Sequence, residues 1–185
     1  RIEQLLLTPM LQDHLLKDSS VYFLTLYADG QQHFPSSLRF NRSDSLLSFK
    51  FREPDVSVEV RFSEKGYYLT FEVVKAEPAG RIEAIQWGPL FTTISEKVGE
   101  VAGVVRDDKK ALGMLLLNIE TLGGEYNRNG ICEGRGCLAR PLPGGSSLQA
   151  YTINRDRRRE VSAMGHDQIP VNPVKGKTVE GSRIA

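Results

Sequence analysis

The sequence predicts an all-β protein, an antiparallel β-sandwich with one short N-terminal helix. Apolar and polar residues alternate along several segments, which is the spacing of half-buried strands. Turn residues recur roughly every 8–12 positions, a rhythm typical of sandwiches and barrels. With 185 residues, 40% of them hydrophobic, the chain is long enough to form its own core. We therefore expect a single domain over residues 1–185.

The helix is expected near the N-terminus. Thr8 fits a helix N-cap, and Pro9 fits the first helical position. Leu11 and Leu15 follow at helical spacing. The helix is expected to end near Lys17, after about two turns.

After this segment the apolar spacing becomes that of strands. Val56, Val58 and Val60 alternate with polar residues, and Gly66 supplies the turn into the next strand. Residues 107–110 are expected to form a charged hairpin tip. The predicted strands cover residues 21–27, 47–51, 56–63, 67–73, 81–87, 98–106, 111–118, 147–154, 159–164 and 178–184.

Residues 122–146 are the one irregular stretch, rich in Gly, Pro and Asn and without periodicity. A loop of this length in a compact domain is usually functional or disordered, so it is the first place to look for a site. It contains Cys132 and Cys137, the only two cysteines of the chain. They favour either a local disulfide, in an oxidising compartment, or two free thiols. A zinc site needs about four ligands, so we expect neither a metal nor another cofactor.

The candidates for ligand binding are two aromatic residues and two arginines. Tyr126 lies in the irregular stretch and is the better exposed candidate for stacking on a sugar ring. Trp87 is either a stacking residue or a core residue at a strand end. Arg155 and Arg157 belong to the basic run 155–160, whose guanidinium groups fit phosphate, sulfate or an acidic sugar. The alternative for this run is a hairpin turn whose arginines are solvated or paired with neighbouring acidic residues.

The sequence shows no catalytic constellation. It has no Gly-x-Ser-x-Gly nucleophile elbow and no glycine-rich phosphate loop, so we assign no catalytic residue. The 24 basic and 23 acidic residues give a formal net charge of +1, which argues against a nucleic-acid-binding domain. No run approaches about 18 consecutive apolar residues, so we expect no membrane span.

Several segments resemble a known group of proteins. They are residues 66–73 (GYYLTFEV), 87–94 (WGPLFTTI), 98–107 (VGEVAGVVRD), 117–124 (LNIETLGG), 145–151 (GSSLQAY) and 181–185 (GSRIA). Together they resemble the N-terminal β-sandwich region of large glycoside-hydrolase-like proteins from polysaccharide-degrading bacteria.

The resemblance implies a large sandwich of the galactose-mutarotase type (supersandwich-like) that precedes a catalytic (β/α)8 barrel. The catalytic carboxylates would then lie beyond residue 185. The chain itself would be a non-catalytic accessory domain that supports this downstream domain and contacts oligo- or polysaccharide. Because residue 1 is Arg and residues 176–185 look like the start of a strand, we expect the natural polypeptide to continue. The expected location is periplasmic or extracellular, with the cytoplasm as the alternative.

Two other functions stay open at this point. A stand-alone carbohydrate-binding module would need an exposed aromatic platform or a calcium-bound polar cleft. A small enzyme would need a cleft that gathers His, Asp or Glu with shifted pKa values. An accessory domain is expected to expose an apolar patch. A free-standing binder is instead expected to show a polar groove rimmed by aromatic rings.

Overall fold

The protein is almost entirely β, as the sequence predicts. A computed structural model describes residues 6–7, 12–13, 21–126, 138–163 and 166–185, in which the one helical element is the 3-10 turn η1 (Ala79–Arg81). The strands are β1 (Leu6–Leu7), β2 (Gln12–Asp13), β3 (Leu24–Ala28), β4 (Gln31–His33), β5 (Ser37–Asn41), β6 (Leu46–Phe51), β7 (Val56–Glu64), β8 (Leu69–Glu77), β9 (Ala84–Thr92), β10 (Lys97–Val98), β11 (Val104–Arg106), β12 (Ala111–Gly113), β13 (Thr121–Gly123), β14 (Ala139–Leu142), β15 (Gly145–Ile153), β16 (Arg159–Ala163), β17 (His166–Val171) and β18 (Arg183–Ile184).

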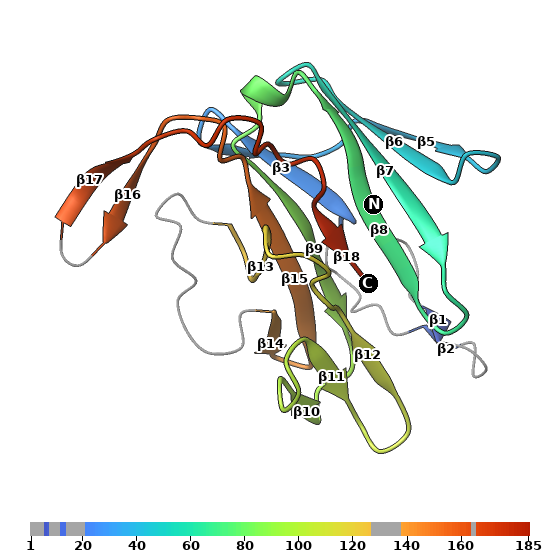
Figure 1. Cartoon of the computed structure of the whole chain (residues 1–185). Coiled ribbons are helices and arrows are strands. Elements are labelled where there is room, and N and C mark those ends of the chain that lie inside the picture. The colour runs from blue at the N-terminus through green and yellow to red at the C-terminus, as the bar shows by residue number, and fades with distance from the viewer. Residues whose placement is uncertain (1–5, 8–11, 14–20, 127–137, 164–165) are drawn as a thin grey trace.

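Two antiparallel sheets form the sandwich (Figure 1). The six-stranded sheet has the order β13-β15-β9-β3-β4, with β14 also paired to β15. The five-stranded sheet has the order β18-β8-β7-β6-β5. A small sheet, β10-β11-β12, lies at one end of the sandwich, and the β16–β17 hairpin projects from the other end.

Alternation along the strands decides which side chains enter the core. On β7, Val56, Val58 and Val60 are fully buried, while the intervening Ser57 and Glu59 face outward. The same alternation on β3, β9 and β15 supplies the opposite half of the core. The two apolar faces then remove each other from water, which is the main force that stabilises a sandwich.

Trp87 of β9 lies inside this core. Its side chain is fully buried, and its partners on the neighbouring strands are Leu24 and Ala150. The ring meets Phe23 edge to face, with centroids 5.5 Å apart. Its Nε1 donates a hydrogen bond to the Ser182 hydroxyl at 2.9 Å. The indole is therefore both packed and hydrogen-bonded, as a buried tryptophan requires.

The C-terminal segment closes one edge of the sandwich. β18 pairs with β8, and Val179, Ser182 and Ile184 are all buried. The Ser182 hydroxyl lies 2.6 Å from Thr152 Oγ1 and 3.4 Å from Thr121 Oγ1. These buried hydroxyls share hydrogen bonds with one another, so a polar seam between the sheets avoids the cost of unpaired groups.

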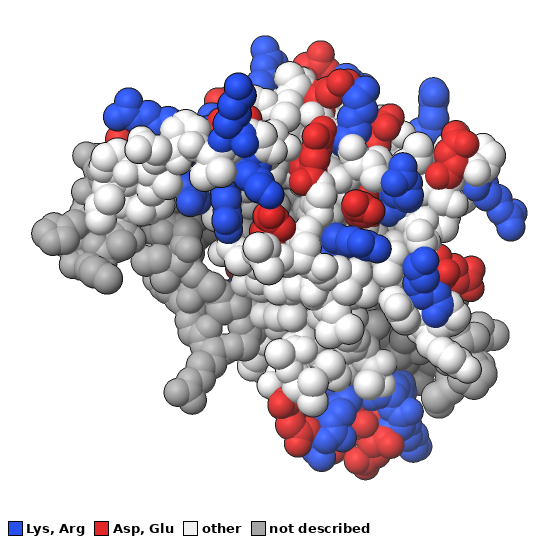
Figure 2. All heavy atoms as spheres, in the orientation of Figure 1, with Lys and Arg blue, Asp and Glu red and all other residues white. Residues whose placement is uncertain are grey.

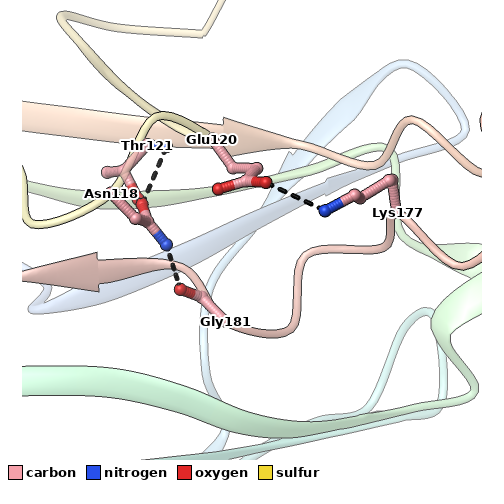
Figure 3. Close-up of polar contacts among 5 residues, drawn as sticks. All are labelled: Asn118, Glu120, Thr121, Lys177 and Gly181. Carbon is pink, nitrogen blue, oxygen red and sulfur yellow. Dashed lines mark hydrogen bonds and ion pairs between the residues drawn. The ribbon is translucent and has the colours of Figure 1, made fainter.

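A second set of polar contacts extends this seam toward the surface (Figure 3). Thr121 Oγ1 donates to Asn118 Oδ1 at 2.5 Å, and the Asn118 amide donates to the Gly181 carbonyl. Lys177 Nζ lies 3.1 Å from Glu120 Oε1. Residues 118–121 thus hold the segment before β18 against the six-stranded sheet.

The segment predicted as one strand over 98–106 is instead a hairpin of β10 and β11. Gly103 has φ +73° and lies in the turn between them. A Cβ at this position would collide with the Met114 carbonyl oxygen and the Leu138 side chain. Only glycine combines this backbone conformation with so close an approach, and it ends the strand there.

The short helix predicted from residue 8 to residue 17 is not found where the structure describes that segment. Gln12–Asp13 form β2 and pair with β1, and the remaining residues of the predicted helix lie outside the described residues. A helix of about two turns has little stability of its own, so strand pairing can override its local preference.

The stretch predicted to be irregular, 122–146, is partly sheet. Its ends form most of β13, all of β14 and the start of β15, while residues 127–137 lie outside the described residues. Among the described strands, β14 pairs with β15 alone, so it is an edge strand. Pro141 has no backbone N–H to donate, and an edge strand tolerates this because one of its sides forms no ladder. Pairing with β15 makes these ends strands, although they have no apolar periodicity of their own.

The other predicted strands are present with shifted bounds. The strand expected over 81–87 starts at Ala84 and continues to Thr92. The strands expected over 111–118 and 178–184 are shortened to β12 and β18. Residues 107–110 form the predicted hairpin tip, in which Asp107 N donates to the Lys110 carbonyl at 2.9 Å.

Candidate functional site

The outer face of the six-stranded sheet carries a polar and aromatic group of side chains. Gln86 of β9 lies between Thr25 of β3 and Tyr151 of β15. Because the next residue, Trp87, points into the core, Gln86 and its two partners face the other side of the sheet. Gln86 is nevertheless only 1% exposed. Glutamine is mostly a surface residue, so a buried amide here indicates a built arrangement on this face.

Tyr27 and Tyr126 both donate to the Gln86 side chain. The Tyr27 hydroxyl lies 3.1 Å from Gln86 Oε1, and the Tyr126 backbone nitrogen lies 3.3 Å from the same atom. The two tyrosine rings meet edge to face, with centroids 4.7 Å apart. Tyr126 follows β13 in the chain. Its contacts with Tyr27 of β3 and Gln86 of β9 hold it against the sheet.

Tyr151, which is only 3% exposed, completes what we call the tyrosine cluster: Tyr27, Tyr126 and Tyr151. The rings of Tyr126 and Tyr151 have centroids 6.0 Å apart. Burial, with smaller contributions from Glu125 and Tyr126, raises the pKa of Tyr27 to about 12. Burial also raises the pKa of Tyr151, against an opposing effect of the Arg159 charge. Both phenols therefore stay protonated at neutral pH and keep their ability to donate hydrogen bonds.

A charged pair lies beside the tyrosine cluster. Arg140 of β14 places its Nη1 2.9 Å from Glu125 Oε2, and both side chains are partly exposed. Glu125 immediately precedes Tyr126, and its charge acts on Tyr27. An exposed pair of this kind adds little stability, roughly 0–1 kcal/mol, but it supplies polar groups at the margin of the cluster.

The end of β15 leads into a group of basic side chains. Arg155 and Arg157 lie between β15 and β16, and Lys175 and Lys177 lie in the loop before β18. The Arg155 backbone nitrogen donates to the Lys177 carbonyl at 2.7 Å, and Arg157 Nη1 lies 3.3 Å from the Arg81 carbonyl. We call this group of basic residues the basic junction: Arg81, Arg155, Arg157, Lys175 and Lys177. Figure 2 shows several Lys and Arg side chains, with some Asp and Glu among them, at the end of the molecule from which the β16–β17 hairpin projects.

The strand β15 and the turn after it connect the tyrosine cluster to the basic junction. Tyr151 precedes Arg155 on the same strand and turn, and its ring contacts Tyr126. Arg159 begins β16, directly after the turn, and its charge acts on the Tyr151 phenol. Two of the regions predicted from the sequence, around Tyr126 and around Arg155, therefore lie at the same end of the six-stranded sheet.

The ligand-binding role predicted for Trp87 is corrected by the structure. Its position in the sheet register directs the ring into the core, and the side chain has no exposed surface. A sugar needs an open ring face for stacking, which Trp87 does not offer. The alternative reading of Trp87 as a core residue is confirmed.

Tyr126, Arg155 and Arg157 are all partly exposed, as a role in binding requires. The run 155–160 connects two strands, but β16 pairs with β17 and not with β15, so it is no hairpin turn. Among the described residues, the arginines of this run form no ion pair with Asp156 or Glu160. Cys132 and Cys137 lie outside the described residues, and their disulfide stays a prediction.

The sequence does not reveal Tyr27, Gln86 or Tyr151 as members of a site. Each stands one position away from a buried core residue, so strand alternation alone places it on the outer face. Nothing in the local pattern shows that the three strands are neighbours. Only the register of β3, β9 and β15 brings these side chains together.

A second surface lies beside the C-terminal strand. Leu115, Leu117 and Ile119 are 53%, 38% and 87% exposed. The backbone of Leu115 exchanges hydrogen bonds with Ala185, and Leu117 N donates to the Arg183 carbonyl. We call these three residues the leucine–isoleucine stripe. The bridge between Leu116 and Ile184 places this segment next to β18.

Two further properties concern metals and membranes. Within the described ranges, no group of three or more His, Cys, Asp or Glu residues is arranged to hold a metal ion. None of the helical structure described has the length and apolar character needed to cross a membrane.

The fold and these surfaces define an antiparallel all-β sandwich with a tyrosine cluster beside a basic junction. Comparisons of the chain with protein-family models, with curated proteins and with solved structures find no match.

Proposed function

We propose that this chain is a non-catalytic accessory β-sandwich domain of a carbohydrate-active protein that acts outside the cytoplasm. In this proposal it contacts glycan through Tyr126, which the rest of the tyrosine cluster holds in place, and supports a catalytic domain of the same polypeptide. The observation that carries the proposal is the cluster itself, in which three rings and a buried amide are joined on one sheet face.

The chemistry of the tyrosine cluster suits a sugar. A pyranose ring has apolar C–H faces that pack on aromatic rings, and hydroxyls that need hydrogen-bonding partners. Tyrosine offers both in one side chain. Tyr126 packs against Tyr27 and Tyr151, so its ring is held in place before any ligand arrives. A fixed ring loses less conformational entropy on binding than a mobile one.

The leucine–isoleucine stripe supports the accessory role. Three exposed apolar side chains within five residues are more than the scattered exposed residues of an ordinary surface. The stripe lies beside β18 through the backbone bonds of Leu115 and Leu117. A domain that follows β18 in the same polypeptide would be delivered next to this stripe and would cover it.

The test is affinity electrophoresis of the purified chain through gels that contain plant, algal or host polysaccharides. For a polysaccharide that retards the native chain, Tyr126→Ala should weaken the affinity at least tenfold, which corresponds to about 1.4 kcal/mol. Tyr67→Ala is the matched control, because Tyr67 is fully exposed in the turn between β7 and β8. Circular dichroism of each variant confirms that it is folded.

Either of two results would overturn the glycan-binding proposal. One is that no polysaccharide retards the folded chain. The other is that Tyr67→Ala weakens retardation as much as Tyr126→Ala, which would move the contact to the β7–β8 turn.

The tyrosine cluster equally fits a stand-alone carbohydrate-binding module, and the leucine–isoleucine stripe separates the two functions. An accessory domain without its partner should bind a dye that recognises exposed apolar surface, and Leu115→Ser with Ile119→Ser should reduce this binding. A stand-alone module should show no dye binding that these substitutions remove.

A further inference from the structure

The basic junction has a rigid backbone. Asn154 directs its side-chain amide to the carbonyls of Ala79 and Ile82, at 2.9 and 2.8 Å. The same side chain accepts a bond from Asp156 N at 3.0 Å. The turn that carries Arg155 and Arg157 is thus fixed to the segment around η1, and its position does not depend on a ligand.

Additional backbone bonds join this turn to the loop before β18. Arg155 N and Asp156 N both donate to the Lys177 carbonyl, at 2.7 and 3.0 Å. In return, Val174 N donates to the Arg155 carbonyl at 2.7 Å. Two segments that are distant in sequence therefore present their basic side chains from one hydrogen-bonded unit.

Positive charge is in excess at the basic junction. Lys177 pairs with Glu120, and the charge of Arg155 also acts on Glu120. Within the described part of the chain, Arg81, Arg155, Arg157 and Lys175 have no ion-pair partner. The charge of Arg81 also acts on Asp55, and Asp156 lies in the turn between Arg155 and Arg157, so five basic residues meet fewer acidic ones at the junction. The chain as a whole carries a net charge of only +1, so this excess is local.

We propose that the basic junction binds the anionic group of an acidic or sulfated sugar. This inference rests on the proposed function, since it names the class of glycan that the adjoining tyrosine cluster receives. The planar guanidinium groups of Arg155 and Arg157 fit carboxylate and sulfate oxygens through paired N–H donors. Tyr126, a partly exposed ring of the tyrosine cluster, packs on the sugar ring, while the junction neutralises the charge of the sugar. A neutral sugar gains no affinity from the basic junction.

The small extent of the basic junction favours a sugar over a nucleic acid as the source of the anion. A nucleic acid is bound through basic side chains spread along its backbone, and its affinity grows with the number of phosphates contacted. The basic junction is compact. The outer face of the five-stranded sheet mixes the two signs instead, with Lys50 paired to Asp55 and Lys75 paired to Glu77.

The experiment compares four gels that contain polygalacturonate, dextran sulfate, neutral dextran or duplex DNA. The test variant carries Arg155→Gln and Arg157→Gln. The matched control carries Arg39→Gln and Arg42→Gln, which removes the same charge from exposed positions on the distant β5–β6 hairpin. Polygalacturonate and dextran sulfate distinguish a carboxylate from a sulfate as the bound group.

We expect the test variant to lose at least tenfold in affinity for one or both acidic polysaccharides, and the control to stay within about twofold. A third variant with Arg155→Lys and Arg157→Lys keeps the charge but loses the guanidinium geometry. It should bind more weakly than the native chain and more tightly than the Gln variant.

Each other outcome has a definite meaning. If the control weakens binding as much as the test variant, the effect is general charge and the inference is wrong. If DNA retards the chain as strongly as the acidic polysaccharides do, the junction is a general polyanion site and the inference is wrong. If neutral dextran or another neutral glycan retards the chain, and the test variant changes nothing, the inference fails while the proposed function stands. If no polysaccharide retards the chain, the proposed function itself fails.

Discussion

Trp87 Nε1 donates a hydrogen bond to Ser182 Oγ across 95 positions of sequence, at 2.9 Å and in the fully buried interior. Thr152 Oγ1 lies 2.6 Å from the same hydroxyl. The contact therefore ties the C-terminal segment to two central strands of the six-stranded sheet, β9 and β15. An apolar core and a polar seam meet at this one serine.

Ser182→Ala should destabilise the protein by about 1–3 kcal/mol, because it leaves the buried Trp87 nitrogen without its acceptor. Urea unfolding followed by tryptophan fluorescence measures the change, and Trp87 is the only tryptophan that reports. Ser57→Ala is the control, since Ser57 lies on the outer face of β7. Equal effects of the two substitutions would show that the Trp87–Ser182 bond contributes no stability of its own.

Ile184→Ala should cost about 2–5 kcal/mol, the usual range for truncation of a buried isoleucine. Ile184 is 3% exposed and lies between β8 and the bridge to Leu116. Ile119→Ala removes the same atoms from a side chain that is 87% exposed, and it should change stability by less than about 0.5 kcal/mol. Thermal unfolding of both variants makes the comparison. A similar loss in both would contradict the burial of the C-terminal strand.

Gly88→Ala should destabilise the protein more than Gly144→Ala. Both glycines have positive φ, +78° and +75°, so both substitutions carry a backbone cost of about 1–2 kcal/mol. At Gly88 a Cβ would also lie 2.7 Å from the Leu148 carbonyl oxygen and 2.7 Å from Leu90 N, whereas at Gly144 it would meet open space. Chemical denaturation of the two variants separates backbone strain from collision. Equal losses would mean that the sheet yields at Gly88 without cost.

Stability should fall in alkaline solution as Tyr27 ionises. Burial raises the Tyr27 pKa from 10.0 to about 12, so the folded state holds this proton more tightly than the unfolded state. The resulting stability is fully present below the unfolded pKa and is lost as pH rises through the folded one, between pH 10 and about 12. Tyr27→Phe should make this loss smaller.

Phenolate absorbance as a function of pH measures the ionisation directly. Tyr27→Phe should remove the latest-titrating phenol, and the late step that remains belongs to Tyr151, whose pKa burial also raises. Tyr67→Phe, at a fully exposed position, should leave the late step intact. If Tyr27→Phe leaves the latest step unchanged, Tyr27 is not buried as the structure places it.

Local patterns were enough to predict those strands that have one apolar face and one polar face. The alternation of Val56, Val58 and Val60 with polar residues identified β7, and Gly66 marked its turn. The pattern failed where structure depends on a distant partner. Gly103 stands in a strand-like sequence, but its contact with Met114 and Leu138 makes it a turn. The ends of the stretch 122–146 became strands only through pairing with β15.

By itself, the sequence determined the fold class, most of the strands and the presence of Tyr126 and the basic run 155–160 as candidates. Periodicity and turn chemistry act over a few residues, so they can be read without a partner strand. Only the tertiary structure decided that Trp87 is buried, that Tyr27 and Tyr151 join Tyr126, and that Lys177 meets Arg155. These relationships are set by sheet register and by the packing of one sheet on the other. Both are long-range properties that no local pattern encodes.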